Sequence, residues 1–315
     1  MQSKKGRQLK PRYSIGEWYG ESFEQLSPEL RIKRAKIEIK KNGLVGNLCP
    51  FVKDAKCNKK GGVCSIRRYQ KGDDGVVSCS GPLVTTCPAR FLENDEIFRW
   101  VGNTILKNEE PIVLSQIGFL NRRIPKTSQS EKGGRDFIGR IDNVLVHPTK
   151  IPLEWCALEL QAVYFSGTNM RKEFSALAIN ECEGIPFPAA NRRPDWRSSG
   201  PKRLLPQLET KVPTIRTWGK KMAVVIDEAF FESLVGLERV EHLSSAEIVW
   251  FVVGYDKGAS NGWTLALREV AFTTLEGSVK ALTSALALSQ EAFEEQLRLK
   301  LKASHPKHPL TEKLA

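Results

Sequence analysis

Residues 155–167 read WCALELQAVYFSG, an apolar stretch interrupted by Glu159 and Gln161. On an extended strand, side chains at positions i and i+2 share a face, so these two polar side chains point the same way. Both faces are otherwise apolar, which predicts a buried strand. A carboxylate in such a strand is costly unless it is paired or coordinates a metal, so Glu159 needs a partner.

Asp142, in the predicted strand IGRIDNVLVH (138–147), is the natural partner of Glu159. A short connection through the turn PTKIP lets the two carboxylates meet at one edge of the sheet. With the backbone carbonyl of Leu160 they make an oxygen-rich site suited to Mg²⁺. Such an ion polarises a scissile phosphate, activates water and stabilises developing negative charge. These residues therefore predict a metal-dependent phosphodiesterase.

A structural interpretation fits the same spacing. Asp142 then caps a turn, Glu159 pairs with an arginine, and Gln161 hydrogen-bonds a neighbouring loop. The nuclease pattern D…ExK is also not matched, because Gln161 stands where lysine is usual. Glutamine carries no charge and cannot act as a base, so at most it orients water or adds an oxygen ligand.

Strands and helices alternate along the rest of the chain. The β-branched apolar runs KMAVVID (221–227) and AEIVWFVVGYD (246–256) predict two more strands, and residues 96–120 predict mixed helix and strand. Helices are predicted over SPELRIKRAKIEIKKNG (27–43), with Ser27 as N-cap, and over residues 202–217 and 276–304. Strands interleaved with helices indicate an α/β domain with a mixed sheet.

The charge balance favours a polyanionic partner. The chain has 48 Lys+Arg against 36 Asp+Glu, a formal net charge of +12. Nucleic acid is favoured over a membrane, because no apolar run approaches the roughly 18 residues of a spanning helix. The basic start MQSKKGRQLKPRYSIG lacks the apolar core of a signal peptide, so we expect a cytoplasmic protein.

Five of the seven cysteines fall between residues 49 and 88, in short segments rich in Gly and Lys. This region is predicted to form loops with too few apolar positions for a core of its own. Four thiolates around one tetrahedral ion would hold it together, with one cysteine to spare; unligated structural thiols are the alternative. Cys156 and Cys182 lie apart and are predicted to be ordinary buried thiols. The scattered histidines give no support to a nucleophilic triad.

The densest basic segment is NRRPDWRSSGPKR, residues 191–203. An arginine that reaches into the major groove pairs bidentately with guanine, whereas one on a solvated loop contacts phosphates, and both roles are open here. The basic residues of the helix over 27–43 and of NRRIPK (121–126) are predicted to contact phosphates. The DNA-binding candidates of residues 191–203 are Arg192, Arg193, Arg197, Lys202 and Arg203.

Taken in order, EWYG (17–20), CPF, a lone Cys, GVC, CP and ELQAVYFSG (159–167) resemble the NotI family of type II restriction endonucleases. The resemblance spans most of the chain. It implies a PD-(D/E)XK nuclease core in which Glu-x-Gln replaces Glu-x-Lys, with Asp142, Glu159 and Gln161 as the active-site residues. It also implies a small subdomain with a structural iron held by four cysteines; Zn²⁺ also accepts four thiolates. The implied ligands are Cys49, Cys57, Cys64 and Cys87, and Cys79 has no counterpart.

The resemblance also implies an organisation and a set of partners. We expect an N-terminal basic helix and metal-binding subdomain in residues 1–95 and the nuclease domain in residues 96–315. The expected substrate is double-stranded DNA carrying a GC-rich palindrome, cut by a twofold homodimer with bound Mg²⁺. A cognate DNA methyltransferase is a further expected partner.

Two other functions remain open at this point. RecB-like or repair nucleases also join this core to a cysteine-bound metal cluster, but there the ligands are typically split around the core. No Q-x-x-x-Y signature follows Gln161 either. The second alternative is a non-catalytic, metal-stabilised DNA-binding protein, in which the acidic residues are structural.

Overall fold

The strand that carries Glu159 lies inside a six-stranded mixed sheet. The computed structural model describes residues 10–40, 47–121, 137–167, 169–180, 184–258, 262–284 and 289–305. The sheet order is β12-β11-β10-β7-β6-β5. β7 pairs antiparallel with β6 and parallel with β10, and β10 pairs parallel with β11. The strands are β5 (Ile112–Asn121), β6 (Phe137–Val146), β7 (Trp155–Leu160), β10 (Met222–Asp227), β11 (Ile248–Lys257) and β12 (Trp263–Thr273).

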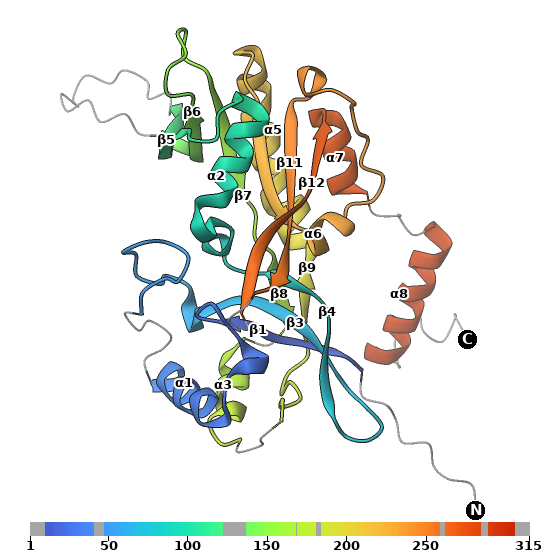
Figure 1. Ribbon diagram of the computed structural model, residues 1–315. Helices are drawn as coiled ribbons and strands as arrows, with labels where there is room; N and C mark the ends of the chain where they lie inside the picture. The colour runs from blue at the N-terminus through green and yellow to red at the C-terminus, as the bar shows by residue number, and fades with distance from the viewer. Residues whose placement is uncertain are drawn as a thin grey trace, which may run out of the picture. The chain divides into compact units, whose positions relative to one another are not determined.

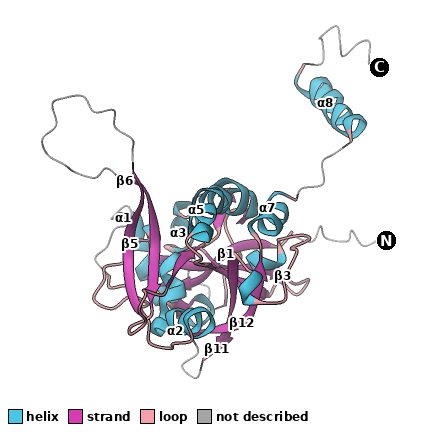
Figure 2. Cartoon of the chain, turned by 90° about the horizontal axis from the view of Figure 1, so that it is seen from above, coloured by secondary structure: helices cyan, strands magenta, loops and turns pink. Residues whose placement is uncertain are grey.

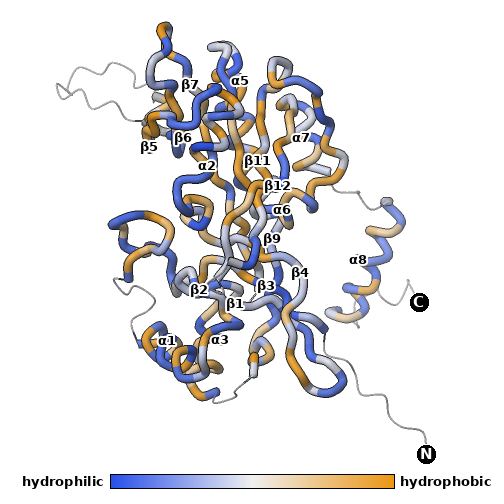
Figure 3. The backbone as a smooth tube through the Cα atoms, viewed as in Figure 1, coloured by the Kyte–Doolittle hydropathy of each residue, from blue (hydrophilic) through white to orange (hydrophobic). Residues whose placement is uncertain are grey.

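These strands confirm the α/β class with a mixed sheet. The predicted strands at 138–147, 221–227 and 246–256 correspond to β6, β10 and β11, whereas β12 had no predicted counterpart. All six residues of β10 and the first eight of β11 are buried. Continuous apolar runs of this kind are typical of strands covered on both faces. Figure 3 shows these central strands in the hydrophobic colours.

Helices cover both faces of this sheet (Figure 2). On one face, α5 and α7 pack on a core that includes Ala157, Val224 and Trp250. On the other face, α2 packs on a core that includes Leu158 and Val225. Glu159 points to the α5 face, because it shares the side of β7 with Ala157. The helices are α1 (Pro28–Lys40), α2 (Glu96–Val101), α3 (Arg171–Leu177), α4 (Trp196–Ser199), α5 (Leu205–Thr217), α6 (Glu228–Glu232), α7 (Leu275–Thr283) and α8 (Gln290–Ser304).

The cysteine-rich region does not form loops alone, so that prediction was wrong. It supplies two strands to an antiparallel sheet of order β2-β1-β3-β4, and their buried Ile66 and Val84 join a core with Ile15 and Trp18 of β1. The alternation was hidden because arginines, glycines and cysteines interrupt it and because the packing partners lie far away in the sequence. The strands are β1 (Arg12–Trp18), β2 (Glu21–Ser22), β3 (Val63–Lys71) and β4 (Val77–Thr85).

The predicted helix starts and stops are partly confirmed. α1 begins after Ser27, whose hydroxyl accepts a hydrogen bond from the Leu30 amide at 3.3 Å. The predicted helix over 202–217 is α5, which follows a π-helical turn, Gly200–Leu204. The single helix predicted over 276–304 is instead two helices, α7 and α8.

The chain forms two compact units, residues 1–282 and 283–315. Both sheets lie in the first unit, and α8 lies in the second. The N-cap of α8 is Ser289, whose hydroxyl accepts from the Ala292 amide at 3.2 Å. Among the described residues, no helix is long and apolar enough to cross a membrane. The boundary expected near residue 95 stays a prediction.

Candidate active site

The predicted carboxylate pair lies at the carboxyl end of β7. Asn143 of β6 faces Leu158 of β7, so the same antiparallel register sets Asp142 opposite Glu159. The two carboxyl groups are close enough for the charge of Asp142 to act on Glu159. Glu159 is only 2% exposed, and burial, together with the charge of Asp142, raises its pKa to about 7. The structure thus brings the two predicted residues together in a poorly solvated place, where a cation would stabilise both charges.

A third charged group, which the sequence analysis missed, joins this pair. Lys211 of α5 forms an ion pair with Glu159 and donates a second hydrogen bond to Gln207 Oε1 at 2.9 Å. Lys211 is 5% exposed, and its positive charge lowers the pKa of Glu159 against the effect of burial. The sequence carries one signal of this: Lys211 occupies the buried stripe of α5, at helical spacing from Leu208 and Ile215.

Gln161 follows the end of β7 and is buried, and its hydrogen bonds are made to backbone oxygens. Its backbone amide donates to Val225 O at 3.0 Å, and its side-chain Nε2 donates to Ala162 O at 2.6 Å. The backbone hydrogen bond continues the pairing of β7 with β10 by one residue beyond the strand. Gln161 therefore lies beside the pair along the chain, with its amide nitrogen directed to the backbone.

The basic segment is attached directly to this site. β8 (Tyr164–Gly167), which begins three residues after Gln161, pairs antiparallel with β9 (Arg192–Asp195). Gly167, with φ of 105°, permits the close approach, because a Cβ there would lie 2.5 Å from Asn191 O. Figure 1 shows β8 and β9 at the end of the six-stranded sheet that faces β1, β3 and β4.

The basic side chains of this segment differ in exposure. Arg193, Arg197, Lys202 and Arg203 are exposed, and the Arg203 guanidinium lies 3.6 Å from the ring centre of Tyr164. Arg192 is 1% exposed.

The buried guanidinium of Arg192 is held on the side of α3. Its Nη1 pairs with Glu173 Oε2 at 2.7 Å, and its Nη2 donates to Asn169 O at 3.0 Å. This position favours a structural role for Arg192 over a DNA contact, while the four exposed residues remain candidates. The predicted phosphate contacts in NRRIPK (121–126) lie outside the described side chains.

The two sheets meet beside the site through Thr85, the last residue of β4. Val163, just after Gln161, donates its amide to Thr85 O at 2.7 Å, and the Thr85 amide donates to Asp227 Oδ2 at 2.6 Å. Asp227 ends β10 and also caps α6 by accepting from the Phe230 amide at 2.8 Å. Burial raises the pKa of Asp227 to about 6. The cysteine-bearing sheet is therefore fixed to the ends of the strands that carry the carboxylates.

The backbone brings four cysteines into one neighbourhood. Cys49 and Cys57 flank a small hairpin, in which the Cys49 amide donates to Ala55 O at 2.7 Å and the Cys57 amide donates to Asn47 O at 2.8 Å. At the ends of β3 and β4, the Cys87 amide donates to Cys64 O at 3.1 Å.

The electrostatics of these thiols separate them from the fifth. The thiols of Cys57 and Cys87 each interact electrostatically with that of Cys49, and the thiol of Cys64 interacts with those of Cys57 and Cys87. Burial raises the pKa of the Cys57, Cys64 and Cys87 thiols. Cys79 lies elsewhere, beside Tyr69 and Glu24.

Three of the four thiols, those of Cys57, Cys64 and Cys87, are neighbours of a cation. The ammonium of Lys59 donates to Thr86 O, and the neighbouring thiols Cys57, Cys64 and Cys87 act against the lowering of its pKa by burial. Within the described ranges, no group of three or more His, Cys, Asp or Glu residues is positioned to hold a metal ion. The donor chemistry fits a metal centre with four cysteine ligands, but the positions of the thiols do not form one.

The two remaining cysteines lie apart from this cluster. Cys156 is fully buried in β7, as predicted, and Cys182 lies outside the described residues.

Comparison with known families matches this chain over residues 33–266 to the family described as Restriction endonuclease NotI. The match covers most of the chain. This protein belongs to the NotI restriction endonuclease family. No curated protein matches it. Membership makes the protein a type II restriction endonuclease, an enzyme that cleaves double-stranded DNA.

The region that matches the NotI family contains the whole candidate site. It includes both carboxylates, Lys211, the basic segment and all four clustered cysteines. The family assignment decides against the RecB-like nuclease and against a protein that binds DNA without cutting it.

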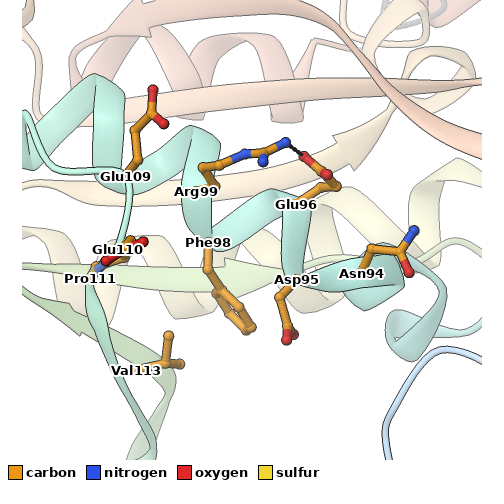
Figure 4. A pocket seen from close by; sticks show the side chains of 9 residues that line it. All are labelled: Asn94, Asp95, Glu96, Phe98, Arg99, Glu109, Glu110, Pro111 and Val113. Atoms are coloured by element: carbon orange, nitrogen blue, oxygen red, sulfur yellow. Dashed lines mark hydrogen bonds and ion pairs between the residues drawn. The ribbon is translucent and has the colours of Figure 1, made fainter.

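A hollow of about 440 Å³ on this NotI family chain has the wrong charge for DNA (Figure 4). Asp95, Glu96, Glu109 and Glu110 line it, and the one guanidinium among its lining residues, that of Arg99, is paired with Glu96. Four carboxylates against one arginine repel phosphates. The charge of this hollow therefore disfavours DNA binding there.

Proposed function

We propose that this restriction endonuclease is a Mg²⁺-dependent enzyme with a PD-(D/E)XK core that hydrolyses phosphodiester bonds within a GC-rich palindrome. In this proposal Asp142 and Glu159 bind Mg²⁺, and Gln161 completes the site. The observation that supports it best is the pair of Asp142 and Glu159, which lie opposite each other at the end of a buried strand. Two carboxyl groups this close cannot both ionise at low cost, and a divalent cation removes that cost.

The residues present suit Mg²⁺ because all the donors are oxygens. The two carboxylates and the backbone carbonyl of Leu160 are hard ligands, and the other positions of an octahedral Mg²⁺ are usually filled by water and phosphate oxygens. When bound, Mg²⁺ would polarise the scissile phosphate and lower the pKa of a coordinated water. Asp142 and Glu159 hold their positions because each lies on a strand of the central sheet, and a rigid strand fixes a side chain better than a loop does.

DNA binding is assigned to the exposed members of the basic segment, which are Arg193, Arg197, Lys202 and Arg203. Arg192 is left out because it is buried and paired. The arginines supply the fork of donors that pairs with guanine O6 and N7, which is the basis for proposing a GC-rich target. Phosphate contacts by the same side chains would account for most of the affinity and make it fall with salt.

The cysteines Cys49, Cys57, Cys64 and Cys87 are proposed as ligands of a structural Fe or Zn centre within residues 1–95. The support is that the four thiols are electrostatic neighbours, whereas Cys79 lies elsewhere. Metal binding requires the thiols to move together and the Lys59 ammonium to move away from them. A homodimer and a cognate DNA methyltransferase complete the proposal, because a palindrome presents the same half-site twice.

The proposal is tested by incubating purified protein with long duplex DNA and Mg²⁺, beside Asp142→Ala and Glu159→Ala variants. We expect discrete fragments from the wild type alone, with DNA binding preserved in both variants. Fragment ends would then map the recognition site. Cleavage that persists in either variant, or in the presence of EDTA, would refute the assignment of the carboxylates. Loss of binding in the same variants would show that they are structural.

A further inference from the structure

Lys211 is the buried charge that the proposed mechanism leaves unused. Lysine is almost never fully buried unless it is paired, and here the side chain is 5% exposed, with its ammonium between Glu159 and Gln207. Burying an ammonium is costly even when it is paired, so its position needs a reason. One apolar residue at that place in α5 would continue the stripe formed by Leu208 and Ile215.

The active-site strand lacks the charge that Lys211 carries. In the D…ExK pattern a lysine stands two residues after the glutamate, and here that residue is Gln161. Its amide cannot bear a positive charge, and its nitrogen is hydrogen-bonded to Ala162 O. Lys211 brings an ammonium to the same carboxylate from the helix that covers this face of the sheet.

The path of the chain places Lys211 next to the DNA-binding segment. From β9 the chain passes through α4 and the π-helical turn Gly200–Leu204 directly into α5. The exposed Arg203 is eight residues before Lys211, a rise of about 12 Å along a helix. One helical run therefore carries exposed basic side chains at its start and the buried ammonium two turns later.

We propose that Lys211 is a catalytic residue of this endonuclease and supplies from α5 the positive charge that Gln161 leaves missing from β7. This inference rests on the proposed function. During hydrolysis a bond forms between a water oxygen and phosphorus, and the bond from phosphorus to the leaving sugar oxygen breaks. The proton of the attacking water passes to solvent, and the leaving oxygen takes a proton from solvent. Lys211 keeps its proton throughout. Its ammonium would turn from Glu159 to the phosphate oxygens, on which negative charge develops, and Mg²⁺ held by Asp142 and Glu159 would supply further positive charge there.

A purely structural role predicts different behaviour. If Lys211 only neutralises Glu159, its loss lowers stability and leaves cleavage by the folded fraction intact. A cation moved to the strand could not restore what was lost. The two roles therefore predict different results in two measurements. One is the rate constant of cleavage by folded protein, and the other is whether a lysine at position 161 restores cleavage.

The experiment compares Lys211→Gln, the double variant Gln161→Lys/Lys211→Gln, and Lys220→Gln as a control on a half-buried lysine just after α5. Single-turnover cleavage of duplex DNA is measured at saturating enzyme and Mg²⁺, with DNA binding and thermal unfolding measured on the same samples. Lys211→Gln is expected to cleave about 100-fold more slowly while its affinity for DNA changes little. The double variant should regain about tenfold or more of that loss, and Lys220→Gln should match the wild type.

Lys211→Gln that cleaves within about threefold of the wild type would overturn the proposal, since a lost charge stabiliser costs far more. A slow Lys211→Gln that is not rescued by Gln161→Lys would overturn it as well. If Lys211→Gln does not fold, Lys211→Met decides the matter, because it fills the same buried place without a charge. Slow cleavage by folded Lys211→Met supports the proposal, and full activity overturns it. The Asp142→Ala variant tests the proposed function separately from the role of Lys211. If Asp142→Ala cuts like the wild type, the proposed function itself fails, and the role of Lys211 fails with it.

Discussion

Replacing Arg90 by methionine should destabilise the protein more than any other single change to an ion pair. The Arg90 guanidinium and the Glu17 carboxylate are both fully buried, with Nε 3.0 Å from the carboxylate. Arg90 also pairs with Glu93 Oε2 at 2.9 Å and donates to Trp263 O at 2.8 Å. It lies 4.4 Å from the ring centre of Phe51, in the cysteine hairpin. One side chain thus joins β1, the hairpin and β12.

The expected loss of unfolding free energy follows from the Glu17 carboxylate, which stays buried after the change. Methionine fills part of the volume, but Glu17 then keeps only the hydroxyl of Ser65, 2.8 Å away, as a partner. Breaking a buried pair from one side costs about 3–5 kcal/mol, and we expect about 4 kcal/mol for Arg90→Met. The double variant Glu17→Leu/Arg90→Met removes both charges and should recover about half of that loss.

Urea unfolding followed by tryptophan fluorescence measures these free energies. The matched control is Arg99→Met, which breaks the i,i+3 pair with Glu96 at a side chain that is 53% exposed. It should cost less than about 0.5 kcal/mol. An Arg90→Met variant that loses under about 1 kcal/mol, or a double variant less stable than the single one, would refute the reasoning, because neither outcome fits an uncompensated buried carboxylate.

Three further outcomes are expected. Because burial raises the pKa of Asp227 from 3.8 to about 6, this group's contribution to the unfolding free energy is complete below about pH 4 and is lost as the pH rises through 6. The loss is about 3 kcal/mol, measured as the difference between wild type and Asp227→Asn across that range, and a constant difference would contradict it. Arg203→Ala should weaken DNA binding and reduce its salt dependence, whereas Arg192→Ala should lower the melting temperature; equal effects on binding would contradict the division by exposure. Elemental analysis should find Fe or Zn in Cys79→Ala as in the wild type but not in Cys64→Ala, and metal-free wild type would end the proposal of a metal centre.

The part of the site that the sequence predicted is the part built from neighbouring strands. Period-two alternation places Glu159 and Ala157 on one face, and the short connection from β6 to β7 sets Asp142 beside Glu159 without reference to the rest of the chain. Lys211 was not predicted as part of the site because it contacts Glu159 across 52 residues of sequence. A lysine on a helix is expected by default to be solvated.

The part of the fold that was missed depends on pairing over longer distances. β3 and β1 pair residues such as Ile66 and Ile15, and the two sheets are joined where Thr85 meets Asp227, 142 residues along the chain. Nothing in the local pattern of β3 or β4 identifies those partners. Arg192 illustrates the same limit, because its neighbours Arg193 and Arg197 look alike in sequence and only burial separates them.

The segment between Gln161 and Lys211 is held near the carboxylates at both of its ends. At one end β8 pairs with β9, and at the other Lys211 returns to Glu159. The exposed side chains of Arg193, Lys202 and Arg203 lie between those two attachments. A surface loop tied at one point could move independently of the site, whereas a segment tied at two points can change position only by disturbing a strand pair or a buried ion pair. The side chains proposed to contact DNA therefore stand at a defined offset from the carboxylates proposed to cut it, as cleavage at a fixed place in a sequence requires.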